Sequence, residues 1–247
     1  MDTHYNWFES WFNSPYYHVL YKERDTKEAE AFLDTLIRFL KPPAGASILD
    51  VACGKGRHAM YLNKLGFDVT GFDLSPESIA FDKRYENDYL AFYLHDMRET
   101  SWVNCFDYVF NLFTSFGYFE KEHDNVKTIK ANSAALKEGG TLVLDFMNAD
   151  KVMRHLPYAE TKLVNGISFD VRKYIKDDYI VKEITFTDQG KSFHFFEQLT
   201  IFRLNDFEKY FKDSHLTIQH IFGDYALNTF DLQKSERLIL IAKKEKQ

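Results

Sequence analysis

The sequence predicts an α/β protein with a doubly wound, mostly parallel sheet and a small antiparallel β insert after the fifth strand. Between residues 46 and 147, short apolar segments alternate with segments of helical periodicity, the order of elements that doubly wound sheets require. Beyond Asn148, apolar and polar residues alternate and turn signals interrupt them, which is typical of antiparallel hairpins.

The parallel region is expected to contain five strands and four helices. Pro42 ends the first helix and Gly66 the second, whereas Ser75 followed by Pro76 is typical of a helix N-terminus. The expected helices span residues 27–40, 57–65, 76–85 and 125–136, the last one closed by the glycine pair at 139–140. The expected strands span residues 48–51, 67–72, 90–94, 106–112 and 141–146.

The region after Asn148 is expected to form the insert and then to return to the large sheet. We place an antiparallel insertion at residues 150–204, within a single domain that spans residues 1–247. Asn205 and Glu208 resemble a capping box at the start of another helix. The strand-like segments of the insertion are residues 167–175, 179–187 and 192–204, and the closing strands of the large sheet are 217–222 and 237–242.

Polar residues stand at the carboxyl ends of four expected parallel strands. They are Asp50, Asp73, Asp96 and Asn111. Ligands of doubly wound folds bind in the crevice at that edge of the sheet, where the strands end together. The four residues therefore predict a binding site at this edge.

A glycine loop lies between the first strand and its helix. Gly54 and Gly56 allow backbone N–H groups to approach a ligand closely at a helix N-terminus. Together with Ala59 they fit the pattern G-x-G-x-x-A, and Asp73, nineteen residues after Gly54, is an acid suited to a ribose diol. The pattern predicts an adenosine-containing cofactor, and taken alone it fits NAD.

Composition narrows the class of protein. The 31 Lys and Arg residues against 37 Asp and Glu give a formal net charge of −6, which argues against a non-specific nucleic-acid binder. Cys53 and Cys105 form neither a disulfide framework nor a metal-ligand pattern. Because the sequence shows no signal-peptide pattern and no run of 18 apolar residues, we expect a cytoplasmic protein without membrane contact.

Four segments, taken in order, carry a family resemblance: ILDVACGKGRHAMYL, GFDLSPESI, LHDMRE and FDYVFNLFTSFGYF. They resemble the class I S-adenosylmethionine-dependent methyltransferases over residues 45–147, with the closing strands at 217–242. The resemblance implies a Rossmann-like, seven-stranded sheet and S-adenosyl-L-methionine as cofactor. Within the family, the chain is similar to small-molecule enzymes with an antiparallel insert, including glycine-type and sugar-amine N-methyltransferases.

The resemblance implies roles for residues around the adenosine. Asp73 would accept hydrogen bonds from both ribose hydroxyls, and Leu74 would pack on the adenine. Asp96 would accept from the adenine amino group, and the backbone N–H of Met97 would bond a ring nitrogen.

Around the methionine part of the cofactor, the resemblance implies a loop formed by Asp50, Ala52, Gly54 and Gly56. Ala52 stands where the family usually has its first glycine. Arg57 would either contact the cofactor carboxylate or cap a local turn.

Two further pairs complete the implied cofactor site. Asn111 and Phe113 would line the methionine side near the sulfonium. Tyr17 and Tyr21 resemble the aromatic lid of related enzymes, although they could equally be core aromatics.

The sequence leaves the methyl acceptor open. Residues 111–114 read Asn-Leu-Phe-Thr and not N-P-P-Y/F, no Pro-Cys pair follows the strand, and no carboxylate cluster suggests a magnesium site. We expect metal-independent, in-line transfer to N or O of a small molecule, with no residue identified as catalytic. The acceptor-side candidates are Tyr118, His123, His194, Glu197, Tyr225 and Arg237. Residues 223–242 resemble the corresponding end of sugar-amine methyltransferases, which would bring Tyr225 or Arg237 near the pocket mouth. The insert is expected over the active site, and its strands could pair across a homodimer.

Two other functions fit parts of the sequence. An NAD-dependent oxidoreductase fits the glycine pattern with Asp73, although no second nucleotide-binding half and no Tyr-x-x-x-Lys pair is apparent. A catalytically silent cofactor-binding module would keep the same residues without turnover.

Overall fold

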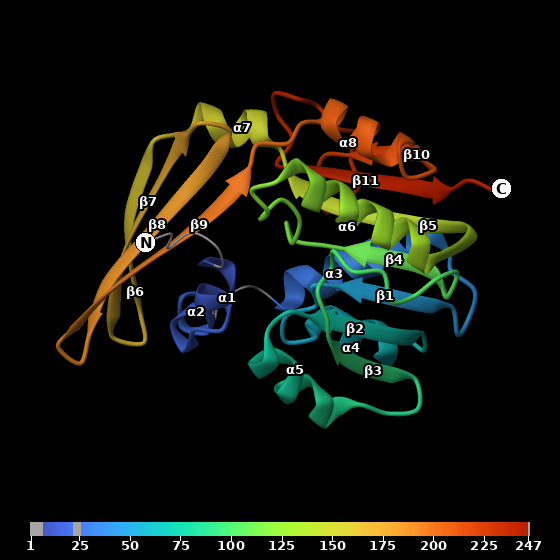
Figure 1. Ribbon diagram of the computed structural model, residues 1–247, viewed down its shortest axis with the longest axis horizontal. Coiled ribbons are helices and arrows are strands. Elements are labelled where there is room, and N and C mark those ends of the chain that lie inside the picture. The colour runs from blue at the N-terminus through green and yellow to red at the C-terminus, as the bar shows by residue number, and fades with distance from the viewer. Residues whose placement is uncertain (1–6, 22–25, 247) are drawn as a thin grey trace.

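A computed structural model, which describes residues 7–21 and 26–246, confirms the predicted fold class (Figure 1). The large sheet has seven strands in the order β10-β11-β5-β4-β1-β2-β3. The pairs from β5 to β3 are parallel, and β11 is antiparallel to both of its neighbours. Its strands are β1 (Ser47–Val51), β2 (Asp68–Asp73), β3 (Leu90–Leu94), β4 (Phe106–Asn111), β5 (Leu136–Met147), β10 (Leu216–Phe222) and β11 (Arg237–Lys244).

Helices cover both faces of the large sheet, which is why its central strands are apolar throughout rather than alternating. Along β5, Leu142 and Leu144 join one core cluster and Val143 joins the other. The helices packed on the first face are α6 (Glu122–Ala135) and α8 (Leu204–Lys212), and those on the second are α3 (Thr26–Leu40), α4 (Arg57–Lys64) and α5 (Pro76–Asp82), which a 3₁₀ turn at Lys83–Tyr85 extends. None of the helices within the described ranges combines the length and the apolar character needed to cross a bilayer.

A four-stranded antiparallel sheet follows β5 and α7 (Ala149–Arg154), and we call it the insert sheet. Two short helices near the N-terminus, α1 (Trp7–Phe12) and α2 (Pro15–Leu20), lie between the insert sheet and the large sheet (Figure 1). The strands of the insert sheet are β6 (Tyr158–Val164), β7 (Ile167–Lys176), β8 (Tyr179–Asp188) and β9 (Lys191–Thr200).

Two details of the insert region differ from the sequence expectation. The edge strand β6 was not foreseen because its side chains are mostly exposed and it lacks an apolar pattern. The predicted capping box at Asn205 and Glu208 is wrong, since α8 already begins at Leu204. The carboxylate of Asp206 accepts a hydrogen bond from the backbone N–H of Arg203 (2.8 Å), and this bond organises the first turn instead.

The glycine pair at 139–140 also has a different role from the expected helix end. Helix α6 ends at Ala135, and β5 already begins at Leu136. The pairing of β5 with β4 shifts register between Phe106 and Tyr108, and Gly139 has a φ of +73°. The glycines therefore accommodate a bulge inside β5.

Candidate functional site

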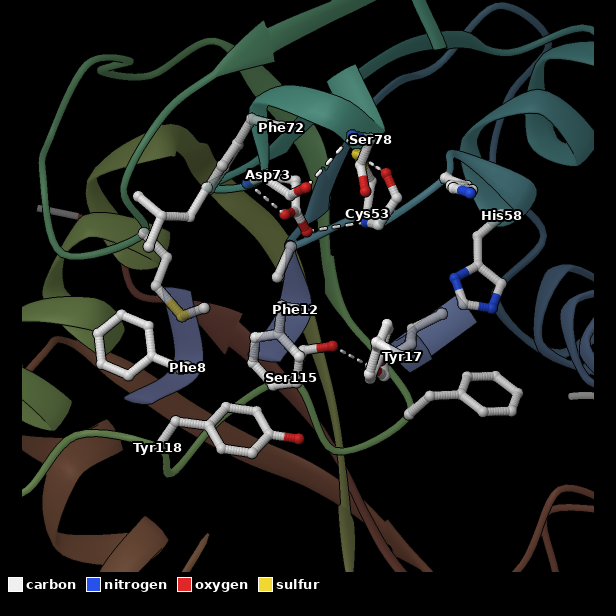
Figure 2. A pocket seen from close by; sticks show the side chains of 18 of the residues that line it. Phe8, Phe12, Tyr17, Cys53, His58, Phe72, Asp73, Ser78, Ser115 and Tyr118 are labelled. Atoms are coloured by element: carbon white, nitrogen blue, oxygen red, sulfur yellow. Dashed lines mark hydrogen bonds between the residues drawn. The ribbon is translucent and has the colours of Figure 1, made fainter. Parts of the chain in front are cut away.

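A cavity of about 440 Å³ lies at the carboxyl edge of the parallel strands. Its walls come from the loops after β1, β2, β3 and β4 and from helices α1 and α2. Figure 2 shows Asp73 and Cys53 on one wall and Phe8, Phe12 and Tyr118 on the opposite one. A ligand held there would touch the strand ends on one side and aromatic rings on the other.

Ten of the predicted cofactor residues line this cavity: Tyr17, Tyr21, Ala52, Gly54, Arg57, Asp73, Leu74, Asp96, Met97 and Phe113. Asp50, Gly56 and Asn111 do not line it. Asp50 and Asn111 are buried beneath it, with 1% and 0% of their surface exposed, so they could act on a ligand only from behind the wall.

The loop after β1 owes its shape to three residues in left-handed conformations. Ala52, Gly54 and Gly56 have φ values of +57°, +57° and +61°. A Cβ atom added to Gly54 would meet nothing within 4 Å, so this residue leaves the loop open. A Cβ atom on Gly56 would lie 2.9 Å from the ring of Phe92, so this glycine is required for packing of the loop onto β3.

Asp73 joins the loop after β1 to the loop after β2. Its Oδ2 atom accepts from the backbone N–H of Gly54 (2.9 Å), and its Oδ1 atom accepts from that of Ser75 (2.8 Å). Burial raises the pKa of this carboxyl group despite both bonds. Each oxygen retains acceptor capacity, so the side chain can also receive hydroxyl groups of a ligand in the cavity.

Two more buried carboxyl groups lie close to Asp73. Burial raises the pKa of Asp50 to about 7, and its Oδ2 atom has no hydrogen-bond partner. Burial, together with the charges of Asp73 and Asp50, raises the pKa of Asp82 to about 8. This group of acids favours a positively charged ligand part at the glycine loop and disfavours a negatively charged one.

The Asp96 side chain is fixed by a neighbour that the sequence did not single out. Arg98 pairs with Asp96 (Nη2 to Oδ2, 2.6 Å), reaches Asp124 (3.4 Å), and lies over the ring of Phe119 (4.6 Å). Burial by itself would raise the pKa of Asp96, but the hydrogen bonds and charge of Arg98 lower it. Asp96 is therefore a fixed anion at the cavity wall.

The turn after β4 is strained and is stabilised by a buried ion pair. Phe113 and Thr114 have φ values of +56° and +59°. Asp145 is fully buried, pairs with Arg237 (2.7 Å) and accepts from the Phe113 backbone N–H (2.8 Å). Arg237 also donates to the Thr114 hydroxyl (2.9 Å), and the Tyr225 hydroxyl donates to Asp145 (3.3 Å).

This network corrects the expected position of two acceptor-side candidates. Arg237 and Tyr225 do not line the cavity; they lie behind the Phe113–Thr114 turn. Tyr225 packs on the rings of Phe32 (4.5 Å between centroids) and Phe113 (5.0 Å). Both residues therefore shape the wall from behind it.

The remaining acceptor-side candidates lie in three places: at the cavity, on the surface and against the N-terminal helices. Tyr118 lines the cavity, with its hydroxyl donating to the Thr114 carbonyl (2.8 Å), whereas His123 and His194 are exposed on α6 and β9. Glu197 lies outside the cavity and contacts the N-terminal helices.

The insert sheet lies on the N-terminal helices that line the cavity and does not line the cavity itself. Within the described chain, the cavity wall contains no residue of β6 to β9, because α1 and α2 intervene. Phe8 and Phe12 of α1 were not foreseen as lining residues. The aromatic density of residues 5–12 was the one sequence signal for them.

Comparison with known proteins identifies relatives. A family model described as "Methyltransferase domain" matches residues 48–140. The chain is 28% identical over 216 residues to the Bacillus subtilis protein named methyltransferase YqeM, covering 83% of this chain and 86% of that one. It is 36% identical over 132 residues to a glycine/sarcosine N-methyltransferase of Parasynechococcus marenigrum, covering 51% of this chain but 46% of the relative.

Among solved structures, an S-adenosylmethionine-dependent methyltransferase from Clostridium acetobutylicum superposes with a TM-score of 0.78 at 21% identity. The match covers 94% of this chain and 96% of that protein, so the whole architecture, insert sheet included, is shared. These relatives are methyltransferases, which favours a sulfonium cofactor over the NAD that the glycine pattern left open.

Proposed function

Since the chain belongs to the class I S-adenosylmethionine-dependent methyltransferase family and is thus an enzyme that uses S-adenosylmethionine, we propose that it methylates a nitrogen or oxygen atom of a small-molecule acceptor. The observation that carries the proposal is the cavity at the carboxyl edge of the sheet, with fixed acids on one wall and aromatic rings on the other. When bound, the cofactor supplies an electrophilic methyl group and leaves as S-adenosylhomocysteine.

The residues present fit that cofactor. Asp73 and Asp96 both line the cavity; Asp73 would accept the ribose hydroxyls, and Asp96, fixed by Arg98, would accept from an adenine amino group. Leu74 and Met97 line the same region, as the family resemblance implies. The fixed orientations of Asp73 and Asp96 and the family resemblance of the sequence support these assignments.

The buried acids near the glycine loop support binding of the positively charged methionine part of the cofactor there. The orphaned Oδ2 atom of Asp50 and the raised pKa values of Asp50 and Asp82 mean that a cation nearby would stabilise their ionised forms. S-adenosylmethionine carries a sulfonium and an ammonium group. The pyrophosphate of NAD would add negative charge beside the same acids, at a cost.

The wall opposite Asp73 is aromatic, and its hydroxyl groups are engaged with the backbone. The rings of Phe8, Phe12 and Tyr118 exclude water from the wall opposite Asp73. The hydroxyls of Tyr118 and Ser115 donate to the backbone carbonyls of Thr114 and Leu112 (2.8 Å each). Amines are the first class to test, as in the glycine/sarcosine relative.

A methyl-transfer screen tests the proposal. The purified protein is incubated with S-adenosylmethionine and a panel of amines, phenols and hydroxy compounds, and S-adenosylhomocysteine is quantified. We expect release above background with at least one amine, and loss of that release in the Asp73→Ala variant. Binding of S-adenosylhomocysteine with no turnover on any acceptor would instead favour the cofactor-binding module.

The single domain with its insertion at 150–204, the cytoplasmic location and a homodimer formed through the insert strands stay predictions from the sequence. Size-exclusion chromatography with light scattering tests the homodimer.

A further inference from the structure

The insert sheet contacts the helices that line the cavity, although it does not line the cavity itself. Trp7, Phe8, Trp11 and Leu20 of α1 and α2 form one buried cluster with side chains of β7 and β8. The insert side of this cluster consists of Phe169, Val171, Ile184 and Phe186. The apolar face of the insert sheet is therefore the surface on which the N-terminal helices rest.

One polar group lies among these apolar contacts. Glu197, on β9, accepts a hydrogen bond from the Trp11 indole N–H (2.8 Å) and another from the Tyr21 hydroxyl (2.5 Å), both at its Oε1 atom. Lys182, on β8, donates to the Tyr21 hydroxyl, lies over the Tyr21 ring (4.4 Å) and pairs with Glu197 Oε2 (3.7 Å). The side chains of Lys182 and Glu197 are 14% and 18% exposed.

The two donors bring Glu197 into contact with both parts of the N-terminal segment. Trp11 is fully buried in α1, and Tyr21 directly follows α2 and lines the cavity next to Tyr17, whose ring is 4.9 Å away. A charged acceptor that receives two hydrogen bonds in a half-buried place is among the stronger polar interactions in proteins. It fixes where Tyr21 stands relative to the cavity.

We propose that Glu197 is a positioning residue for the cofactor site, which acts through Trp11 and Tyr21 to hold the N-terminal helices against the cavity. The insert sheet then supports the N-terminal helices α1 and α2 and makes no direct contact with the cofactor. This inference rests on the proposed cofactor site, because it assigns a function to the helices that line it.

The test measures binding of S-adenosylhomocysteine by isothermal titration calorimetry and its dissociation by stopped flow. Glu197→Ala removes the acceptor, and we expect about tenfold weaker binding, the size of one lost hydrogen bond to a charged group, with faster dissociation. Glu197→Gln keeps an acceptor oxygen, so its loss should be smaller. His194→Ala, an exposed position three residues away on β9, is the matched control and should bind as the wild type does.

A double-mutant cycle separates positioning from a general loss of stability. Tyr21→Phe removes the hydroxyl that Glu197 accepts from. If Glu197 acts through this hydroxyl, the combined Glu197→Gln and Tyr21→Phe variant should lose less affinity than the product of the two single losses. Independent losses in the cycle, or wild-type affinity in both Glu197 variants, would overturn the inference. A wild-type protein that does not bind S-adenosylhomocysteine at all would overturn the proposed function instead.

Discussion

Arg237→Met is the substitution whose effect the structure predicts in most detail. The change places an unbranched apolar side chain in β11 and removes the guanidinium that pairs with Asp145 and donates to Thr114. Asp145, which is fully buried, keeps only the N–H of Phe113 and the hydroxyl of Tyr225 as donors. An uncompensated charge is thus left in the core.

The size of the stability loss depends on whether Asp145 stays charged or becomes protonated once Arg237 is removed. Breaking a buried pair by removing one partner costs about 3–5 kcal/mol. Burial already raises the pKa of Asp145, so without Arg237 the group will take up a proton. Protonating an ordinary aspartate costs about 4 kcal/mol at pH 7 and about 1.5 kcal/mol at pH 5, which limits the loss. We expect the unfolding free energy to fall by about 3–4 kcal/mol at pH 7 and by roughly half of that at pH 5.

Urea denaturation at the two pH values measures this loss. Lys209→Ala is the control, because Lys209 and Glu122 form a surface pair in which both side chains are 64% exposed, and its loss should stay below about 1 kcal/mol. Adding Asp145→Asn to Arg237→Met should recover part of the stability. A loss for Arg237→Met below about 1 kcal/mol, or one equal at both pH values, would refute the reasoning.

Two further predictions concern the glycine loop and the neighbouring acid Asp82. Ala52 has a left-handed backbone, so Ala52→Gly should raise the unfolding free energy by about 0.5–1 kcal/mol. Gly56→Ala drives a Cβ atom against Phe92 and should lower the unfolding free energy by more than about 1 kcal/mol. Denaturation curves of the two variants that shift in the same direction would contradict this prediction. The pKa of Asp82 rises to about 8 on folding. Between about pH 4 and pH 8 the folded state therefore holds a proton on Asp82 that the unfolded chain has released, and the stability that this protonated group contributes is lost as the pH rises toward 8. Asp82→Asn should therefore flatten the decline in stability measured by urea between pH 5 and 8, and an unchanged slope would exclude this role.

The parallel half of the fold could be predicted because its signals are local. Strands buried on both faces read as apolar runs, and the glycine loop with Asp73 lies within a short stretch of sequence. Apart from Tyr17 and Tyr21, the predicted residues of the cavity wall lie at or just after the ends of β1, β2, β3 and β4, where the fold alone brings strand ends together.

The features that sequence reasoning missed depend on contacts between distant segments. Arg237 meets Asp145 across 92 positions, and Glu197 meets Trp11 across 186. Neither partner carries a local pattern, so Arg237 and Glu197 were assigned to the acceptor side rather than to support of the cavity wall. The strand β6 was missed because an exposed edge strand needs little apolar sequence.

The central claim is that the cavity binds the adenosine part of S-adenosylmethionine through Asp73. Isothermal titration of the wild type and the Asp73→Ala variant with S-adenosylhomocysteine, with NAD as the comparison ligand, tests it most directly. We predict binding of S-adenosylhomocysteine and no binding of NAD by the wild type. The folded variant should bind S-adenosylhomocysteine more weakly by about 1–3 kcal/mol, since the ligand hydroxyls lose their charged acceptor. Equal affinity of the folded variant and the wild type, or wild-type binding of NAD alone, would contradict the claim.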